Sequence, residues 1–398
     1  MAERFVVYET GTPRALQDLT TDSEMAASGT NHRKGLVPDP GAVVGIVKYL
    51  NENGTFKQPI YSELSGLPLT LYSGDTQMIN GTFTATTGGN ALTIALKTND
   101  GNDPSASNPV NVIVKNATGF TVLTITSALS FVVSSGSTLG TANNIPFRVW
   151  ILIFDNAGTP KIGVINTVIG GATPTEIFRL FEGDNVTTVA EGGAGAADSA
   201  GVYYADAVIT KRFRIIGYID FSSGQATAGT WITNPDKLTL LGPGVKKSGD
   251  VIQEVWTQTG ASATGTTLIP LDDTIPQSNE GNEYMTLAIT PNSAINILKI
   301  MAEVQMANNA LSQGLVAALF QDTTANALAT CALFQASANF NVLQIINWTM
   351  RAGTASSTTF KVRAGGHLAG TTTFNGRSSA RLYGGTMNSF IKITEIMA

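Results

Sequence analysis

The two histidines of this 398-residue chain are the first candidates for acid–base chemistry. His32 lies in an N-terminal segment flanked by glycine and proline, and His367 follows three small residues, so both positions predict solvated loops. Asp272 and Asp273 are adjacent, which would send them to opposite faces of a strand or leave both solvated in a loop. Hydrolysis needs a nucleophile with a base, or two carboxylates at a defined distance. We therefore predict no catalytic residues and no enzymatic activity.

Cofactor and metal sites have equally little support. The glycine-rich residues 192–198 lack the third glycine and the strand-to-helix context of a dinucleotide-binding loop, and no phosphate-binding Gly-x-x-x-x-Gly-Lys-Ser/Thr element occurs. Cys331 is the only cysteine, which excludes an intrachain disulfide and a cysteine-based zinc site. Its apolar neighbours predict a small buried hydrophobic residue. We predict no cofactor and no metal.

The four tryptophans could act as platforms that stack on sugars. Three of them, Trp150, Trp256 and Trp348, lie inside or beside apolar runs, which predicts core packing. Trp231 follows Gly229 and Thr230 and is the one for which a surface position stays open.

The amino-acid composition limits the classes of partner that the chain is expected to bind. Charged residues make up 13% of the chain, about half the usual share, and the formal net charge is −5. No basic stripe could follow a phosphate backbone, so we do not expect a nucleic-acid partner. The longest apolar run, residues 145–154, contains Arg148 and is half of the roughly 20 residues of a spanning helix. The N-terminus lacks the apolar region of a secretory signal, so neither export nor membrane insertion is expected.

The pattern of apolar residues predicts an all-β protein in three parts. Residues 1–70 are mixed, with a weak helical stretch at 22–27 and an Asn53-Gly54 turn between two short strands. Residues 71–248 carry short apolar runs between turn residues, several of them apolar on both faces. Such runs are expected when a sheet packs against its partner sheet and against another subunit. These runs are residues 92–96, 110–114, 120–125, 147–154 and 213–221.

Residues 249–398 predict a second β-sandwich after a Gly/Pro/Lys/Ser boundary. Alternation is clear at 360–364 and 391–394, as in half-buried antiparallel sheet. Residues 297–310 also fit helical spacing, and we expect a strand there because of the β context. The other expected strands are residues 251–257, 284–289, 315–321, 342–350 and 390–396.

Three sets of residues resemble fibre-type structural proteins of tailed bacteriophages. The first set resembles a short N-terminal element of fibre chains, with Phe56 where that element often has Trp. The second resembles a middle domain, and the third resembles a C-terminal β-sandwich used as a fibre tip. The sets are residues 35–41, 48–50 and 53–56; residues 91–98, 102–105, 146–150 and 213–218; and residues 273–277, 280–285, 318–322, 359–363 and 391–396.

The resemblance implies a homotrimer in the virion, assembled in the host cytoplasm. Residues 1–70 would dock on other virion proteins, and two β-sandwich, jelly-roll-like domains would follow. The implied function is a short trimeric tail fibre for host attachment, with a host glycan or protein as the receptor. Receptor contacts would lie in tip loops such as residues 353–358 or 370–377, although no receptor-binding residue is identified. The alternatives are a capsid-mounted head fibre or decoration protein and a glycan-degrading tailspike, whose repetitive β-helix rungs are absent from the sequence.

Overall fold

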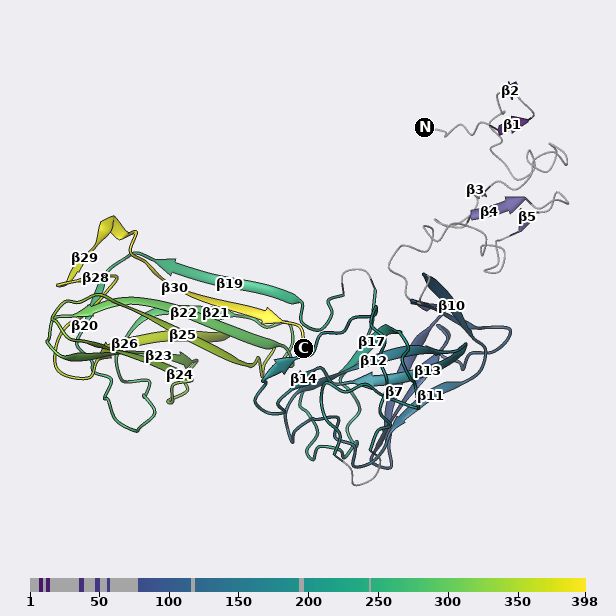
Figure 1. Ribbon diagram of the computed structural model, residues 1–398, viewed down its shortest axis with the longest axis horizontal. Helices are drawn as coiled ribbons and strands as arrows, with labels where there is room; N and C mark the ends of the chain where they lie inside the picture. Colours follow the sequence, from purple (N-terminus) through teal and green to yellow (C-terminus); the bar gives the residue numbers. More distant parts are fainter. Residues whose placement is uncertain are drawn as a thin grey trace. The chain divides into compact units, whose positions relative to one another are not determined.

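The structure is a computed structural model that describes residues 78–398 apart from 116–118, 193–196 and 243–244, together with five short strands nearer the N-terminus (Figure 1). These five are β1 (Val7–Glu9), β2 (Thr12–Arg14), β3 (Leu36–Pro38), β4 (Val47–Leu50) and β5 (Phe56–Lys57). β4 pairs with β5, as the Asn53-Gly54 turn predicted. The helical stretch expected at residues 22–27 lies outside the described residues. Contacts divide the chain into two compact units, Met1–Gly74 and Asp75–Ala398.

The described residues confirm the all-β prediction. In the middle region, residues 78–248, a five-stranded sheet has the order β16-β13-β12-β17-β18, and two three-stranded sheets have the orders β10-β9-β6 and β11-β8-β7. The strands are β6 (Met78–Ile79), β7 (Thr82–Gly88), β8 (Ala91–Lys97), β9 (Val110–Lys115), β10 (Phe120–Ile125), β11 (Leu129–Val133), β12 (Phe147–Asn156), β13 (Thr159–Ile165), β14 (Val168–Ile169), β15 (Glu176–Ile177), β16 (Tyr204–Ala205), β17 (Phe213–Phe221) and β18 (Lys237–Leu240).

The chain itself covers both faces of the five-stranded sheet. On one face, alternate residues of β12 such as Val149 and Ile151 join a core with β8 and β9 of the smaller sheets. On the other face, Trp150 and Leu152 pack with Leu180 and other residues of the connecting segments. The sequence led us to expect another subunit against one of these faces. Instead the long connection between β15 and β17 folds back over it, which sequence periodicity cannot reveal.

Two hairpins of the middle region have two-residue turns in which both residues have positive φ. Gly89 and Asn90 (58° and 64°) connect β7 to β8, and Ala157 and Gly158 (55° and 85°) connect β12 to β13. Turns with positive φ at both positions match the right-handed twist of the paired strands. Glycine is the residue that reaches this conformation without a steric cost. These turns therefore fix the register of both hairpins.

Residues 249–398 form a jelly roll. When its eight long strands are numbered in chain order, the two sheets read 1-8-3-6 (β19-β30-β22-β25) and 2-7-4-5 (β21-β26-β23-β24). The eight strands are β19 (Val251–Thr259), β21 (Asn282–Ile289), β22 (Ile297–Asn308), β23 (Gln313–Gln321), β24 (Ala329–Gln335), β25 (Val342–Arg351), β26 (Thr358–Gly366) and β30 (Ser389–Ile396). The strand expected over residues 297–310 is therefore confirmed as β22.

Shorter elements extend the first sheet at its end farther from the middle region. β22 continues past β30 to pair with β27, which pairs with β20. A small hairpin, β28–β29, and a 3-10 turn follow. The bounds are β20 (Ala263–Gly265), β27 (Thr372–Phe374), β28 (Gly376–Arg377), β29 (Ala380–Arg381) and η3 (Tyr383–Gly385).

The jelly-roll core lies between its two sheets. Alternate residues point inward, among them Ile300 and Val304 of β22, Leu319 of β23 and Phe360 of β26. A second, smaller cluster lies on the outer face of the β21-β26-β23-β24 sheet. There Ile269, from the connection between β20 and β21, packs on Val316, Ala318 and Phe320 of β23, with partly buried Ala327 beside them. The connection before β21 therefore covers part of an outer sheet face.

A buried joint connects the jelly roll to the middle region. Arg148 on β12 donates to both carboxylate oxygens of Asp220 on β17, at 2.6 and 2.8 Å, and its guanidinium lies 4.0 Å from the ring centre of Tyr218. The indole Nε1 of Trp150 donates to the Ala398 carbonyl oxygen at 3.2 Å. Met397 is buried beside Trp150. Residues after β30 are therefore held within the middle region's core.

Candidate functional site

The described groups that were considered for catalysis are His367, Asp272 and Asp273. His367 accepts a hydrogen bond from the Gly314 backbone N–H through Nδ1 at 2.7 Å. Asp272 accepts from the backbone and hydroxyl of Thr274, which lowers the pKa of its carboxyl group. Both aspartates, Asp272 and Asp273, are exposed in the connection before β21. His32 lies outside the described residues. Among the described residues, His367 therefore does not share a site with Asp272 and Asp273.

The described residues contain no group of three or more His, Cys, Asp or Glu side chains that could hold a metal ion. In the glycine-rich stretch, Gly192 donates its N–H to Asp198, and residues 193–196 are outside the described part. Partial burial and the nearby Glu191 carboxylate raise the pKa of the Asp198 carboxyl group, against the hydrogen bonds from Gly192 and Ser137 that lower it. In the part of the chain that the structure describes, no helix is long and apolar enough to cross a membrane.

The tryptophan predictions are partly wrong. Trp231 is fully buried, donates to the Ser137 carbonyl oxygen at 3.0 Å and packs edge-on against Phe147 and Phe221. Trp150 is also fully buried and Trp348 is half-buried, but Trp256 on β19 is 64% exposed. Trp256 lies opposite Lys392 of β30 on the outer face of its sheet. Alternation places it outward, and the apolar run around it concealed this.

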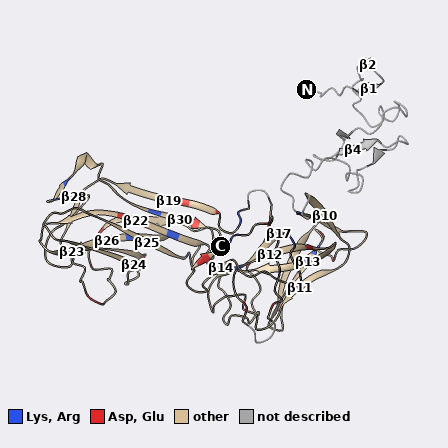
Figure 2. Cartoon of the chain, viewed as in Figure 1, with Lys and Arg blue, Asp and Glu red and all other residues tan. Residues whose placement is uncertain are grey.

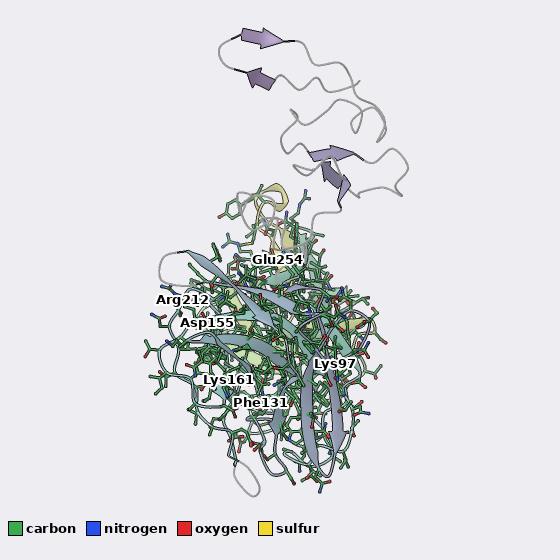
Figure 3. All side chains as sticks on the ribbon, turned by 90° about the vertical axis from the view of Figure 1, so that its right-hand side faces the viewer. Lys97, Phe131, Asp155, Lys161, Arg212 and Glu254 are labelled. Carbon is green, nitrogen blue, oxygen red and sulfur yellow. The ribbon has the colours of Figure 1, made fainter. Side chains whose placement is uncertain are left out.

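Two open hollows lie on the middle region. The larger, of about 440 Å³, is lined by residues 179–184 together with Lys247, Ser248 and Asp250. The smaller, of about 240 Å³, is lined by Lys115, Asp155, Lys211 and Arg212 among others, and Figure 3 shows Asp155 and Arg212 at the same edge of the molecule. Charged residues are otherwise sparse over the strands, as Figure 2 shows.

Within residues 78–398, one end of the jelly roll contacts the middle region and the opposite end, called here the free end, does not. At the first end, Arg351 of β25 donates from Nη2 to the Gly171 carbonyl oxygen at 3.1 Å, and burial lowers the pKa of its guanidinium to about 10. Ile297 and Ile396 pack there with Val168. The free end carries the connections that follow β22, β24 and β26, and the β28–β29 hairpin (Figure 1).

Buried amide side chains hold the loops of the free end in place. The Gln335 amide accepts from the Asn308 N–H and donates to the carbonyl oxygens of Asn308 and Ala310, at 2.8 to 3.1 Å. Gln313 exchanges hydrogen bonds with the backbone of Leu368, at 2.7 and 2.9 Å. Because these amides are buried, breaking any of these bonds would leave an unsatisfied polar group. The free end is therefore a fixed surface.

Four large apolar or aromatic side chains are exposed on this surface, among polar ones such as Ser312, Ser337 and Ser378. Leu311, Phe340, Leu368 and Tyr383 are 52 to 76% exposed. Arg377 and Arg381 of the β28–β29 hairpin add positive charge beside them. Of the two tip loops predicted from sequence, residues 370–377 lie at this free end. Residues 353–358 lie at the opposite end, where Gly353 donates its N–H to the Ala294 carbonyl oxygen.

Comparisons with known proteins place the chain in no family. No protein-family model and no curated protein sequence matches it. Among solved structures, the chain is similar to that of infectious bursal disease virus strain Gx, with 13% identity, 82% of this chain and 81% of that chain covered, and a TM-score of 0.23. It is also similar to the VP2 subviral particle of infectious bursal disease virus (12% identity, 83% and 81% covered, TM-score 0.22). A third similar structure is a tailspike protein 4 domain of bacteriophage CBA120. The match covers 31% of this chain and 19% of that chain, with 14% identity and a TM-score of 0.16. At these TM-scores the likenesses establish neither a shared fold nor a shared function.

Proposed function

We propose that this chain is a structural component of a tailed-phage particle, a short trimeric tail fibre that contributes to attachment to the host surface. The observation that carries the proposal is the jelly roll with one end joined to the middle region and a fixed, free opposite end. Three sets of sequence resembling fibre-type virion proteins support it, as does the low charge of the chain. Residues 1–70 would dock on other virion proteins.

Attachment would use the free end of the jelly roll. The surface of Leu311, Phe340, Leu368 and Tyr383 is fixed before binding, so little ordering entropy opposes binding. Aromatic side chains and arginine are the residue types that dominate recognition surfaces. A modest affinity per tip would be multiplied over several tips of one particle. The receptor would be a glycan or a protein of the host surface.

The proposal is tested in the phage that encodes the chain. Replacement of residues 376–381, the β28–β29 hairpin, by a short glycine-serine link should reduce adsorption at least tenfold while particle yield stays unchanged. The matched control replaces residues 354–357 at the opposite end of the jelly roll and should leave adsorption intact. If the phage adsorbs normally after the hairpin is replaced, the proposed role in attachment is wrong.

Position on the particle needs its own experiment. Immunogold labelling with antibodies against the jelly roll should place label at the tail. Label confined to the capsid would exclude the tail fibre and favour a head fibre or decoration protein. Release of reducing ends from host capsule or lipopolysaccharide by the purified chain would instead support a glycan-degrading tailspike.

A further inference from the structure

The smaller hollow of the middle region gathers positive charge in a chain that has few charges. Charged residues make up 13% of the sequence, yet Lys115, Lys211 and Arg212 all line this hollow of about 240 Å³. Of the described residues that line it, Asp155 is the single carboxylate. The lining of the hollow therefore carries an excess of positive charge.

The three cations come from separate segments that the fold brings together. Lys115 is the last residue of β9, and Lys211 and Arg212 directly precede β17. The backbone of Lys211 exchanges two hydrogen bonds with that of Val186, at 2.9 and 3.0 Å. The backbone that carries these side chains is thus fixed before any ligand binds.

Two of the cations converge on Gly183. The Arg212 Nε donates to the Gly183 carbonyl oxygen at 2.9 Å. The Lys115 ammonium lies beside the same residue, because a Cβ atom added to Gly183 would lie 3.3 Å from the lysine Nζ. Like charges gathered in this way repel each other, and an anion that contacts both would relieve the repulsion. The arrangement therefore favours a bound anion.

The two lysines have no carboxylate partner in the part of the chain that the structure describes. The ion pairs found there involve four other lysines, but neither Lys115 nor Lys211. A hollow lined by one sign of charge concentrates ions of the opposite sign more than an open surface does. The two ammonium groups are therefore free to contact an anionic ligand.

The larger hollow is an internal comparison, because its charges are balanced. Its lining contains two cations, Arg179 and Lys247, and three carboxylates. Among these carboxylates, Glu182 lies 2.9 Å from the Arg214 guanidinium and 3.6 Å from the Lys247 ammonium. Asp250 accepts from the Lys247 backbone N–H at 2.8 Å. The larger hollow therefore has no excess positive charge to attract an anion.

The other residues of the smaller hollow limit the class of anion. Asn185 and Thr210 contribute an exposed amide and an exposed hydroxyl group. Asp155 accepts from the Gly158 N–H at 2.7 Å, and a carboxylate has room to accept from a ligand hydroxyl as well. The described lining includes no aromatic side chain on which a nucleobase would stack. The volume is below the roughly 300 Å³ at which pockets for drug-sized ligands begin. These properties fit a small anion that carries hydroxyl groups.

We propose that the smaller hollow binds an anionic sugar, a single ring with a carboxylate or a phosphate group. The anionic group would lie near Gly183, between Lys115 and Arg212. Lys211 would add a third positive charge, and a hydroxyl of the ring would donate to Asp155. This site belongs to the middle region and not to the free end of the jelly roll, and the inference does not rest on the proposed function.

Ligand-observed NMR with the full chain tests the site. The probes are glucuronic acid, glucose 6-phosphate and uncharged glucose, with inorganic phosphate as a competitor. At least one anionic sugar should bind with a Kd of about 1 mM, and glucose should not bind. The sugar that binds more tightly identifies the anionic group. Binding should weaken at high salt, because salt screens the attraction.

Two double variants with the same change in net charge locate the site. Lys115→Gln with Lys211→Gln should weaken binding of the anionic sugar at least tenfold. Lys161→Gln with Lys247→Gln removes two lysines of the middle region that lie next to carboxylates, and this control should bind like the unaltered chain. Thermal unfolding checks that both variants are folded.

Four outcomes overturn the inference. The first is that neither anionic sugar binds the unaltered chain, and the second is that glucose binds as tightly as its charged relatives. The third is that the two double variants bind equally well. The fourth is that inorganic phosphate displaces the sugar at an equal concentration, since the hydroxyl groups would then contribute nothing.

Discussion

The middle region and the jelly roll both have β-sheets with apolar faces, but they cover those faces differently. In the middle region the strand β12 is apolar on both faces, and the chain's own segments bury both. In the jelly roll, residues before β21 cover part of one outer face, while large apolar side chains of β24 and β25, among them Phe334 and Leu343, stay exposed. An apolar sequence run therefore does not show by itself whether the same chain covers it.

The largest effect should come from the buried charge pair of the middle region. Arg148→Met removes the partner of Asp220, whose side chain is 4% exposed, and should lower the free energy of unfolding by about 3–5 kcal/mol. The pair Lys161 and Asp206, at 3.2 Å on the surface, is the control, and Lys161→Met should cost about 0–1 kcal/mol. Denaturant unfolding followed by tryptophan fluorescence measures both. Equal losses of stability in the two variants would show that Arg148 and Asp220 are not buried in the middle region as described.

Truncation of a core side chain in the jelly roll should lower the free energy of unfolding by a similar amount. Phe360 is fully buried between the sheets, and Phe360→Ala should lower the free energy of unfolding by about 3–5 kcal/mol. Tyr383 at the free end is 76% exposed, and Tyr383→Ala should change it by less than about 0.5 kcal/mol. A small effect at Phe360 in thermal or denaturant unfolding would argue against this packing.

An intermediate effect is expected at Glu395, which is fully buried near the joint. Its carboxylate accepts from the Asn296 amide at 2.6 Å, the Gln253 amide at 2.6 Å and the Asn292 N–H at 2.8 Å. Glu395→Gln replaces an acceptor with a donor that faces donors, so it should cost about 1.5–3 kcal/mol. Glu254→Gln on the exposed face of β19 is the control and should leave the unfolding midpoint nearly unchanged. An equal loss of stability in the two variants would contradict the buried network around Glu395.

The smallest effect concerns pH. Burial raises the pKa of Asp198 above its ordinary value of 3.8, so the folded state binds this proton more readily than the unfolded state. The ionised carboxylate therefore costs stability at neutral pH, and the cost disappears as the pH falls below the unfolded value. Asp198→Asn should raise the midpoint of thermal unfolding at pH 7 and leave it unchanged at pH 3. A gain of equal size at both pH values would contradict this cause.

Much of the strand pattern could be predicted from the sequence, because period-two alternation and runs of β-branched residues mark strands such as β8, β12 and β30 directly. β24 was missed, since Ala329–Gln335 has little alternation and only one β-branched residue, Thr330. The jelly-roll order could not be read, because it depends on pairings between distant strands such as β19 and β30. The exposure of Trp256 likewise depends on which face of β19 the second sheet covers.

The candidate surface was only partly visible in the sequence. The loop over residues 370–377 was placed at the tip, but residues 353–358 lie at the opposite end because β25 runs back toward the middle region. The cations of the smaller hollow come from segments far apart in the sequence, so their grouping at Gly183 depends on the fold.

The solution mass of the unaltered full chain, measured by light scattering during size-exclusion chromatography, tests the central claim most directly. One chain has a mass of 41.6 kDa, and the account predicts a single species of three times that mass that does not change on dilution. A stable species with the mass of one chain would contradict it, because the proposed fibre is a trimer.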